Sequence, residues 1–297
     1  DDMLTTTIMA TTAPKYLCPA MNTEMYNNPI TQRNLEGLRS LGYHIMEPAE
    51  GWLACGVTGV GRLPEPEAIV DWLESQMCKS NELEGITVLV TAGGTQENID
   101  PVRYISNHSS GKMGFAIAEA FAKRGANVTL IAGPVNLATP KNVHRIDVTT
   151  AHEMWQASLE SAVKNRIFIG CAAVADYRVA EVAEQKIKKT NDNDELSLKL
   201  VKNPDIIASV ASLEKDRPFV VGFAAETQNV AEYAKSKLQR KNLDMICAND
   251  VSGGQVFGQD QNALQIFWKT GEKALPLADK NKLAEVLVTE IVEHYHK

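Results

Sequence analysis

The chain has 297 residues, enough for one large domain or two ordinary ones, and is 44% hydrophobic and 23% charged, as globular proteins are. Its net charge of −7 argues against general nucleic-acid binding, so an anionic ligand would need local clusters of cations. No apolar run approaches the ~20 residues of a membrane helix, and no signal peptide opens the chain. The five cysteines are scattered, which predicts reduced thiols and a cytoplasmic protein.

The first 80 residues predict short elements, and the abrupt start resembles the inside of a domain, so we expect further sequence upstream. The expected elements are a strand from Tyr16 that ends in a loop, a helix from Pro29 to Gly42 capped by Asn28, a strand from Tyr43 to Met46 and a helix around 69–73. The stretch 51–66 contains too much glycine for a helix or a strand.

Two residues of this part suggest chemistry: Asn22, after a Pro-Ala-Met turn, and Cys55, between small residues of the glycine-rich loop. Each has a simpler interpretation, because Asn is common in turns and caps and no adjacent Lys or His activates Cys55. A polar join near 79–82 predicts one domain over residues 1–80 and a second over 81–297.

The second part opens with a buried-strand pattern over 86–90 and a turn at Gly93, Gly94 and Thr95. About 16 residues without apolar periodicity then lead to a helix from about Lys112 to Arg124. Because a connection from strand to helix normally takes two to six residues, an ordered one this long is usually a working loop.

The end of this loop, Ser109, Ser110, Gly111 and Lys112, supplies hydroxyls and a cation at a helix N-terminus, which suits an anionic phosphate. The alternative is a pair of capping serines with a glycine for packing. Ser106 and Met113 break the Walker pattern, and Ser109 breaks the dinucleotide fingerprint, so neither standard phosphate motif is present.

Strands and helices alternate in the rest of the chain. The expected strands lie at 127–133, 143–148, 168–173, 219–223 and 243–248, the helices at 150–164, 205–213, 228–241 and 279–294, and a hairpin at 263–276, with Asn203 and Pro204 capping the second helix. This alternation predicts an α/β fold with an open, Rossmann-like, mostly parallel sheet covered by helices on both faces. Ligands of such sheets bind at the carboxyl ends of the strands.

Polar residues gather at those predicted strand ends. Asp176 follows one strand, Lys186 lies in an irregular segment beyond it, and Lys237 and Lys241 share one face of a helix. A turn residue, a solvated loop and an exposed helix face are the simpler interpretations. A highly charged anion with Mg²⁺, held by lysines from several elements, accounts for all of them at once.

Several motifs stand in order over nearly the whole of 82–297: GGTxExxDPVRYISNxSSGKMG, GCAAVADY, KIKK, KNPDII, VGFAAET and CANDV. In these motifs the chain resembles the phosphopantothenate–cysteine ligases. The resemblance implies that 4′-phosphopantothenate is condensed with L-cysteine. The bacterial form uses CTP with Mg²⁺, forms an acyl-cytidylate, and releases CMP and pyrophosphate. It also implies a homodimer through the ligase domain, part of whose pantothenate pocket comes from the partner chain.

Site residues follow from the same resemblance. Lys186 would stabilise the charge of the transition state, Asp176 would bind the metal or the ribose, and Asn107 would hold the oxyanion when the cysteine amine attacks. The implied CTP contacts are Gly170, Cys171, Ala172, Asp176, Lys186, Pro204, Asp205, Ile206, Ile207, Phe223, Lys237 and Lys241. Gly93, Gly94, Thr95, Ser109, Ser110, Gly111 and Lys112 would bind the triphosphate or the phosphopantothenate.

In the first part, PAMN and ACGxxGxGRLPEP resemble the C-terminal portion of the flavodoxin-like, FMN-dependent phosphopantothenoylcysteine decarboxylases. The resemblance implies that Asn22 holds the substrate carboxylate. Cys55 would act as the proton donor that reduces the aminoenethiol intermediate. The family's flavin-binding strand and catalytic histidine precede this motif, whereas the first histidine here is His44. We therefore expect no decarboxylation by this chain alone, and a larger homo-oligomer where the flavin domain is complete.

Two other classes of function remain open. One is an NAD(P)-type oxidoreductase on a Rossmann-like sheet, which the failed dinucleotide fingerprint and the long loop disfavour. The other is a non-catalytic assembly protein, in which residues 1–80 serve as an interaction module for flavin-domain partners.

Overall fold

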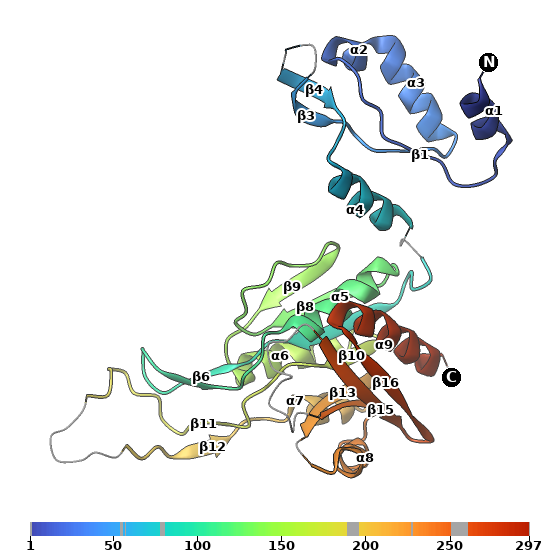
Figure 1. Ribbon diagram of the computed structural model, residues 1–297. Coiled ribbons are helices and arrows are strands. Elements are labelled where there is room, and N and C mark those ends of the chain that lie inside the picture. Colours follow the sequence, from blue (N-terminus) through green and yellow to red (C-terminus); the bar gives the residue numbers. More distant parts are fainter. Residues whose placement is uncertain are drawn as a thin grey trace. The chain divides into compact units, whose positions relative to one another are not determined.

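The computed structural model describes residues 2–53, 56, 58–77, 81–188, 196–226, 228–250 and 261–296. The chain divides into two compact units, Asp1–Lys79 and Ser80–Lys297, called unit 1 and unit 2 below (Figure 1). Within the described ranges, no helix is both long and apolar enough to cross a bilayer.

Unit 1 consists of short elements. In chain order they are α1 (Met3–Ala10), β1 (Tyr16–Leu17), α2 (Thr23–Asn27), α3 (Pro29–Ser40), β2 (His44–Ile45), β3 (Ala49–Trp52), β4 (Thr58–Arg62) and α4 (Pro66–Met77). Strands β1 and β2 pair in parallel, and β3 and β4 form an antiparallel hairpin. The predicted cap of α3 is confirmed, because the Asn28 side chain accepts a hydrogen bond from the backbone N–H of Ile30 at 2.9 Å.

The glycine content of 51–66 predicted neither a helix nor a strand in this stretch. That prediction was wrong, because β3 and β4 form a hairpin there. Its glycines lie within the strands, where Gly51 pairs with Gly59. The carbonyl of Gly61 accepts a hydrogen bond of 2.9 Å from the N–H of Met21, and a Cβ on Gly61 would collide with the Met21 carbonyl oxygen. Glycine at this position therefore permits close approach of two backbones.

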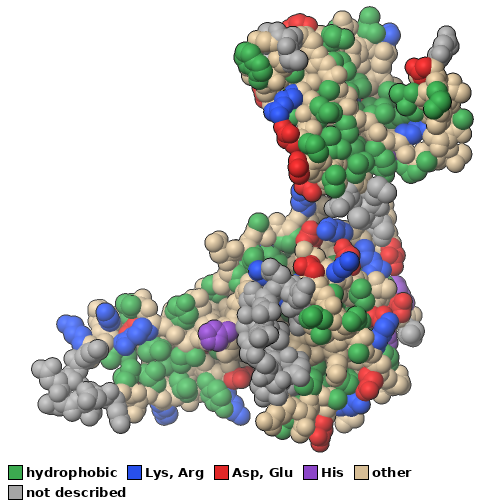
Figure 2. Space-filling view, in the orientation of Figure 1, with side chains coloured by type: hydrophobic (Ala, Val, Ile, Leu, Met, Phe, Trp, Pro, Cys, Tyr) green, Lys and Arg blue, Asp and Glu red, His purple; other side chains and the backbone are tan. Residues whose placement is uncertain are grey.

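Unit 1 leaves much of its apolar surface exposed. The exposed large side chains of unit 1 include Met3, Ile30, Leu41 and Trp52, and Figure 2 shows hydrophobic side chains gathered on one face of this unit. Apolar surface of this kind is typical of an interaction site.

Unit 2 carries the larger sheet. Its described elements are β5 (Thr87–Ala92), β6 (Gln96–Asn98), β7 (Tyr104–Ser106), α5 (Lys112–Lys123), β8 (Asn127–Ala132), β9 (Val143–Asp147), α6 (Ala151–Ala162), β10 (Ile167–Gly170), β11 (Tyr177–Val179), β12 (Leu200–Lys202), α7 (Ile206–Ala211), β13 (Phe219–Glu226), α8 (Val230–Arg240), β14 (Met245–Asp250), β15 (Gln261–Trp268), β16 (Gly271–Asp279) and α9 (Lys280–Tyr295).

The eight-stranded sheet among these elements has the order β16-β15-β14-β13-β10-β5-β8-β9. The six strands from β14 to β9 pair in parallel, and the hairpin β15–β16 adds an antiparallel edge. The prediction of a large, mostly parallel sheet is confirmed. Numbered along the chain, the parallel strands follow the order 3-2-1-4-5-6. The chain adds strands on one side of β5 first and then on the other side, so the order of addition reverses between β5 and β10. A crevice at the carboxyl ends of such strands is the usual ligand site.

Alternate residues of the strands point into two cores. Val88 and Val90 pack with α5 and α9 on one face, whereas Leu89 packs with α6, α7 and α8 on the other. This period of two is why the central strands consist of nearly continuous apolar residues. Both faces of the sheet are covered, so its open end is left for the ligand.

Two local features of unit 2 were not predicted. Strands β6 and β7 pair as an antiparallel hairpin inside the long connection between β5 and α5. The cap of α7 is Asp205, whose side chain accepts from the N–H of Ala208 at 3.0 Å, rather than Asn203 and Pro204. The side chain of Asn203 donates instead to the carbonyl of Ala175 at 2.8 Å.

Candidate functional site

A cavity of about 500 Å³ lies at the carboxyl ends of the central strands of unit 2. Its walls are the end of the long loop, the first turn of α5, the segment after β10, the ends of β13 and β14, and one residue of α9. The lining residues are Asn107, His108, Ser109, Ser110, Gly111, Lys112, Met113, Gly114, Cys171, Ala172, Ala173, Val174, Phe223, Ala224, Ala225, Asn249 and Lys280.

The charge of this cavity differs from that of the whole chain. None of its described lining residues is acidic, and Lys112 and Lys280 both line it, although the chain carries a net charge of −7. A low-dielectric wall whose charged side chains are all positive raises the local concentration of anions. The cavity therefore favours an anionic ligand.

The N-terminus of α5 adds to this preference. The helix has Gly111 as its N-cap, without a side-chain cap hydrogen bond, and the N–H of Gly111 donates to the hydroxyl of Ser109 at 3.3 Å. Because the first amides of a helix carry partial positive charge, a phosphate beside them is stabilised. The predicted residues from Ser109 to Lys112 all line the cavity.

Asn107 is held in place at the mouth of this loop. Its side-chain nitrogen donates to the carbonyl of Val174 at 3.0 Å, which joins the loop to the segment after β10. Its own carbonyl oxygen packs over Gly94, where a Cβ would lie 3.0 Å from that oxygen. The amide nitrogen carries two hydrogens, and this bond uses one of them.

The turn at Gly93, Gly94 and Thr95 supports the cavity without lining it. All three residues are buried. The hydroxyl of Thr95 accepts from the N–H of Ala175 at 3.0 Å, and the carbonyl of Gly93 accepts from the N–H of Ala173 at 2.8 Å. The turn thus fixes the segment 171–175, of which residues 171–174 line the cavity.

A second group of predicted residues lies together outside the described cavity lining. Lys241 and Asp205 form an ion pair of 2.7 Å, and the side chain of Ile207 packs against Gly170 at the end of β10. Ile206 is buried in the core, so its side chain supports α7 from within. Pro204 precedes the cap, and Lys237 is half-buried in the last turn of α8.

Burial raises the pKa of the Cys171 thiol to about 12, and the positive charge of Lys280 opposes this rise. Cys171 is consequently a neutral thiol near pH 7, and its contribution to the cavity wall is shape rather than nucleophilic chemistry.

Asp176 and Lys186 are exposed and do not line the cavity. The structure therefore does not bring these two predicted residues together with Asn107 and the N-terminus of α5. The backbone carbonyl of Asp176 accepts from the N–H of Asn203 at 2.9 Å, which ties it to β12.

An acidic anchor that the sequence did not point to fixes the segment of Lys186. The buried carboxylate of Asp100 accepts from the N–H groups of Val102, Arg103 and Ile187 at 2.9, 2.8 and 3.1 Å. Arg103 pairs with Asp100 at 2.5 Å and donates to the carbonyl of Ile187 at 3.1 Å. The Arg103 guanidinium, with these backbone bonds, holds the pKa of Asp100 well below its usual range.

In unit 1 the two motifs of the decarboxylase resemblance are in contact. The side chain of Asn22 accepts from the N–H of Glu24 at 2.8 Å and caps α2. The residue before it, Met21, bonds to Gly61 of β4. Cys55 lies outside the described residues.

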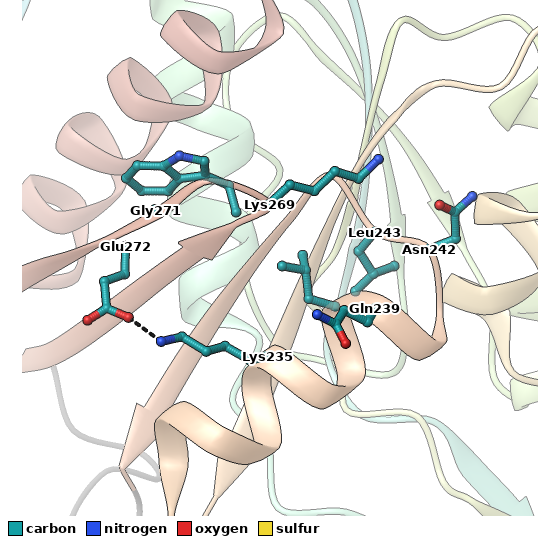
Figure 3. Close-up of a pocket in the computed structure, with 9 residues that line it drawn as sticks. Lys235, Gln239, Asn242, Leu243, Lys269, Gly271 and Glu272 are labelled. Carbon is teal, nitrogen blue, oxygen red and sulfur yellow. Dashed lines mark ion pairs between the residues drawn. The ribbon is translucent and has the colours of Figure 1, made fainter.

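A larger cavity of about 680 Å³ lies between α8 and the hairpin β15–β16 (Figure 3). None of the predicted site residues lines it. Its cation Lys235 forms an ion pair of 2.6 Å with Glu272, drawn as a dashed line in Figure 3. A second lysine, Lys269, and the acidic Glu272 also line this cavity, whereas the described lining of the site beside α5 contains no acidic residue.

The described ranges contain no group of three or more His, Cys, Asp and Glu residues that could hold a metal ion. A divalent cation held by protein ligands alone therefore does not fit the described residues.

Comparison with known proteins identifies the family. The model of the DNA/pantothenate metabolism flavoprotein C-terminal domain matches residues 83–295, and the flavoprotein model matches residues 1–77. The coenzyme A biosynthesis bifunctional protein CoaBC of Haemophilus influenzae is 66% identical over 297 residues, which cover 100% of this chain and 74% of that protein. The chain belongs to the CoaBC family. This membership places it among the multifunctional enzymes of coenzyme A biosynthesis.

Solved structures agree with the family. The C-terminal domain of a CoaBC protein is 36% identical, with a TM-score of 0.61, and the match covers 73% of this chain and 100% of that one. A Cab2 mutant in complex with phosphopantothenate-cysteine is 18% identical with a TM-score of 0.61, over 78% of this chain and 95% of that one, and so shares the fold.

Lys280 lines the cavity but was not predicted. No sequence pattern pointed to Lys280, because it lies more than 160 residues after the loop and directly follows the helix cap Asp279. Only the packing of α9 against α5 brings it to the site.

Proposed function

We propose that unit 2 condenses 4′-phosphopantothenate with L-cysteine, using CTP with Mg²⁺ and forming an acyl-cytidylate. The observation that carries the proposal is the cavity at the strand ends, which has two lysines, a helix N-terminus and no described acidic lining residue. Both phosphorylated substrates are anions that suit such a wall. Membership of the CoaBC family gives the pathway.

The first step activates a poor acyl donor. A carboxylate oxygen of 4′-phosphopantothenate attacks the α-phosphorus of CTP, and the bond from that phosphorus to pyrophosphate breaks. In this proposal Lys186 and Lys112 stabilise the charge that develops on the phosphates. Asp176 binds the ribose or the Mg²⁺ that arrives with CTP. Gly170, Cys171, Ala172, residues 204–207 and Phe223 surround the cytidine, with Lys237 and Lys241 beside the phosphates.

The second step forms the amide. The cysteine amine attacks the acyl carbon, the bond from that carbon to the cytidylate oxygen breaks, and CMP leaves with the former carboxylate oxygen. In this proposal the second N–H of the Asn107 amide holds the oxyanion of the tetrahedral intermediate. Its bond to Val174 fixes the amide before the amine arrives, so little reorganisation is needed.

For unit 1 we propose the substrate-binding end of an FMN-dependent decarboxylase. The flavoprotein match over residues 1–77 and the contact between the Asn22 turn and β4 support it. Asn22 would hold the substrate carboxylate, and Cys55 would be the proton donor. FMN would supply the oxidation of the substrate. The exposed apolar face of unit 1 suits association with further flavin-domain surface.

A homodimer through unit 2, a larger assembly around the flavin domain and a cytoplasmic location complete the proposal. The free thiols of Cys18, Cys171 and Cys247 suit a reducing compartment.

Thermal unfolding with nucleotides tests the substrate class. A ligand at 100 times its dissociation constant adds about 2.7 kcal/mol to the stability of the unit that binds it. MgCTP should therefore raise the melting temperature of unit 2 by several degrees, whereas NADH should not. Stabilisation by NADH or NADPH in place of CTP would favour the oxidoreductase alternative.

A further inference from the structure

The larger cavity of unit 2, called the α8 groove below, lies away from the candidate site. Its lining residue Trp268 pairs with Met245 at the start of β14, whereas Asn249, near the end of that strand, lines the candidate site. The two cavities share no described lining residue. A ligand in the groove would therefore not occupy the candidate site. The volume of the groove, about 680 Å³, is that of a small-molecule site.

One wall of the groove comes from α8 and the turn that follows it. The lining residues of this wall are spaced three or four apart, as neighbours on one helix face are: Lys235, Leu238, Gln239 and Asn242. Leu238 and the lining residue Leu243 are both buried. The groove therefore has an apolar floor with polar side chains along its edge.

The opposite wall is the end of the hairpin β15–β16, and its main feature is an aromatic ring. The indole of Trp268 is half-buried, and the centroid of the His294 ring lies 4.3 Å from its own. A Cβ on Gly271 would lie 2.8 Å from Cζ2 of this indole, so glycine lets the hairpin turn close against the edge of the ring. An indole in the wall of a groove offers a flat ligand stacked or edge-to-face contact.

The charged residues of the groove lie at different ends of it. Lys235 is paired with Glu272 at 2.6 Å, whereas the side chain of Lys269 extends away from this pair (Figure 3). Lys269 is exposed and makes no ion pair within the part of the chain that the structure describes. One end of the groove therefore carries a positive charge that the described residues leave for a ligand.

We propose that the α8 groove is a second binding site of unit 2, for a flat aromatic ring that carries an anionic group. The ring packs against Trp268 and the two leucines, and the anionic group accepts a hydrogen bond from the Lys269 ammonium. Nucleotides and aromatic carboxylates share this chemistry. The inference does not rest on the proposed function, because binding in the groove does not depend on which reaction occurs in the candidate site.

The test is nuclear magnetic resonance of the indole N–H groups in the whole chain with ¹⁵N-labelled tryptophan. The chain has four tryptophans, and Trp268→Phe identifies the signal of Trp268 by its loss. The charged probes are AMP and 2-naphthoate. Their uncharged counterparts, adenosine and 2-naphthamide, keep the ring and lack the anionic group. Ribose 5-phosphate keeps an anionic group without an aromatic ring.

We expect at least one charged probe to shift the Trp268 signal saturably. Its uncharged counterpart should bind roughly ten-fold more weakly, because a hydrogen bond to a charged group contributes more than one to a neutral group. Ribose 5-phosphate should leave the signal unchanged. Lys269→Met should remove the difference between the charged probe and its counterpart. The matched control, Lys282→Met, removes an exposed charge of α9 outside the groove lining and should preserve that difference.

The probe that binds identifies the source of the ligand. Binding of AMP alone indicates a nucleotide, binding of 2-naphthoate alone an aromatic carboxylate, and binding of both the shared chemistry. An unchanged Trp268 signal with both charged probes would overturn the proposal. Equal affinity for charged and uncharged probes, or a Lys269→Met variant that matches the wild type, would also overturn it. Ligation does not enter this readout, so such a result leaves the proposed function standing.

Discussion

Asn107 gives the sharpest prediction at the scale of single residues. Its amide is fixed to Val174 at 3.0 Å on one side, and the proposed second step uses its remaining N–H. In Asn107→Ala, pyrophosphate release from CTP and 4′-phosphopantothenate should stay within about three-fold of wild type. Amide formation should fall by roughly 10²–10³. Pyrophosphate and the cysteine adduct, measured in the same reaction, check both numbers.

The control for this prediction is Asn98→Ala in β6, which removes an exposed amide outside the described cavity lining. It should leave both steps unchanged. If Asn107→Ala abolishes pyrophosphate release together with ligation, Asn107 is a residue of substrate binding rather than of the second step.

Residue types at strand ends were enough to predict one wall of the site. Asn107 and the segment from Ser109 to Lys112 line the cavity. They were predictable because the length and polarity of their loop marked it as a working loop. Lys280 was not predictable, since its place depends on how α9 packs against α5. Asp176 and Lys186 were singled out by their places near the strand ends, their roles came from the resemblance, and their place in the reaction stays a prediction.

At the scale of elements, the Asp100 turn holds the segment that carries Lys186. Asp100→Asn replaces one accepting oxygen with an NH₂ group that faces the donors of Arg103 and Ile187. The backbone of residues 183–188 should therefore open more easily, and its hydrogen exchange should speed up about ten-fold or more. Asp147→Asn is the control, because it breaks an exposed pair with Arg145. Equal exchange in wild type and Asp100→Asn would contradict this anchor.

The same anchor has a defined dependence on pH. The folded-state pKa of Asp100 is lowered, so its contribution is fully present above the ordinary aspartate pKa of about 3.9 and is lost as the pH falls below it. Protection of the Ile187 amide, corrected for the intrinsic exchange rate, should be constant from pH 8 to 5. A decline within that range would show that another group controls the segment.

The hairpin β3–β4 supplies a second prediction for an element. Gly61→Ala places a methyl group against the Met21 carbonyl at a φ of 135°, so unit 1 should lose about 2 kcal/mol or more. Gly37→Ala is the matched control: nothing lies within 4 Å of its Cβ, and it lies inside α3. It should stabilise unit 1 by about 0.5–1 kcal/mol. Hydrogen exchange of residues 49–62 in urea measures both, and equal effects would contradict the close approach.

Elements with their own periodicity were predictable, and elements that depend on a partner were not. Strand β5, helix α5 and the capping box of α6 at Thr150 and Glu153 follow from local patterns. The strands of the hairpins β3–β4 and β6–β7 are three to five residues long and show no regular apolar alternation, so their pairing partners stabilise them instead. Local sequence therefore carried too little signal for these short strands.

At the scale of the whole molecule, two compact units divide the chain at Lys79 and Ser80. The alternation of strands and helices was enough to predict the parallel sheet of unit 2. Each helix connects two parallel strands and covers one face of the sheet, so the strands are buried on both faces. The sheet reverses between β5 and β10, and the cavity lies at that reversal. The sheet order thus explains why residues from Asn107 to Lys280 meet in one site.

The central claim is that the carboxylate of 4′-phosphopantothenate becomes bonded to the cytidylate phosphorus. The direct measurement uses 4′-phosphopantothenate with ¹⁸O in its carboxylate, together with CTP, Mg²⁺ and L-cysteine, and mass spectrometry of the nucleotide product. The account predicts CMP that contains one ¹⁸O atom for each amide formed. CMP without ¹⁸O, or CDP with labelled inorganic phosphate, would contradict it.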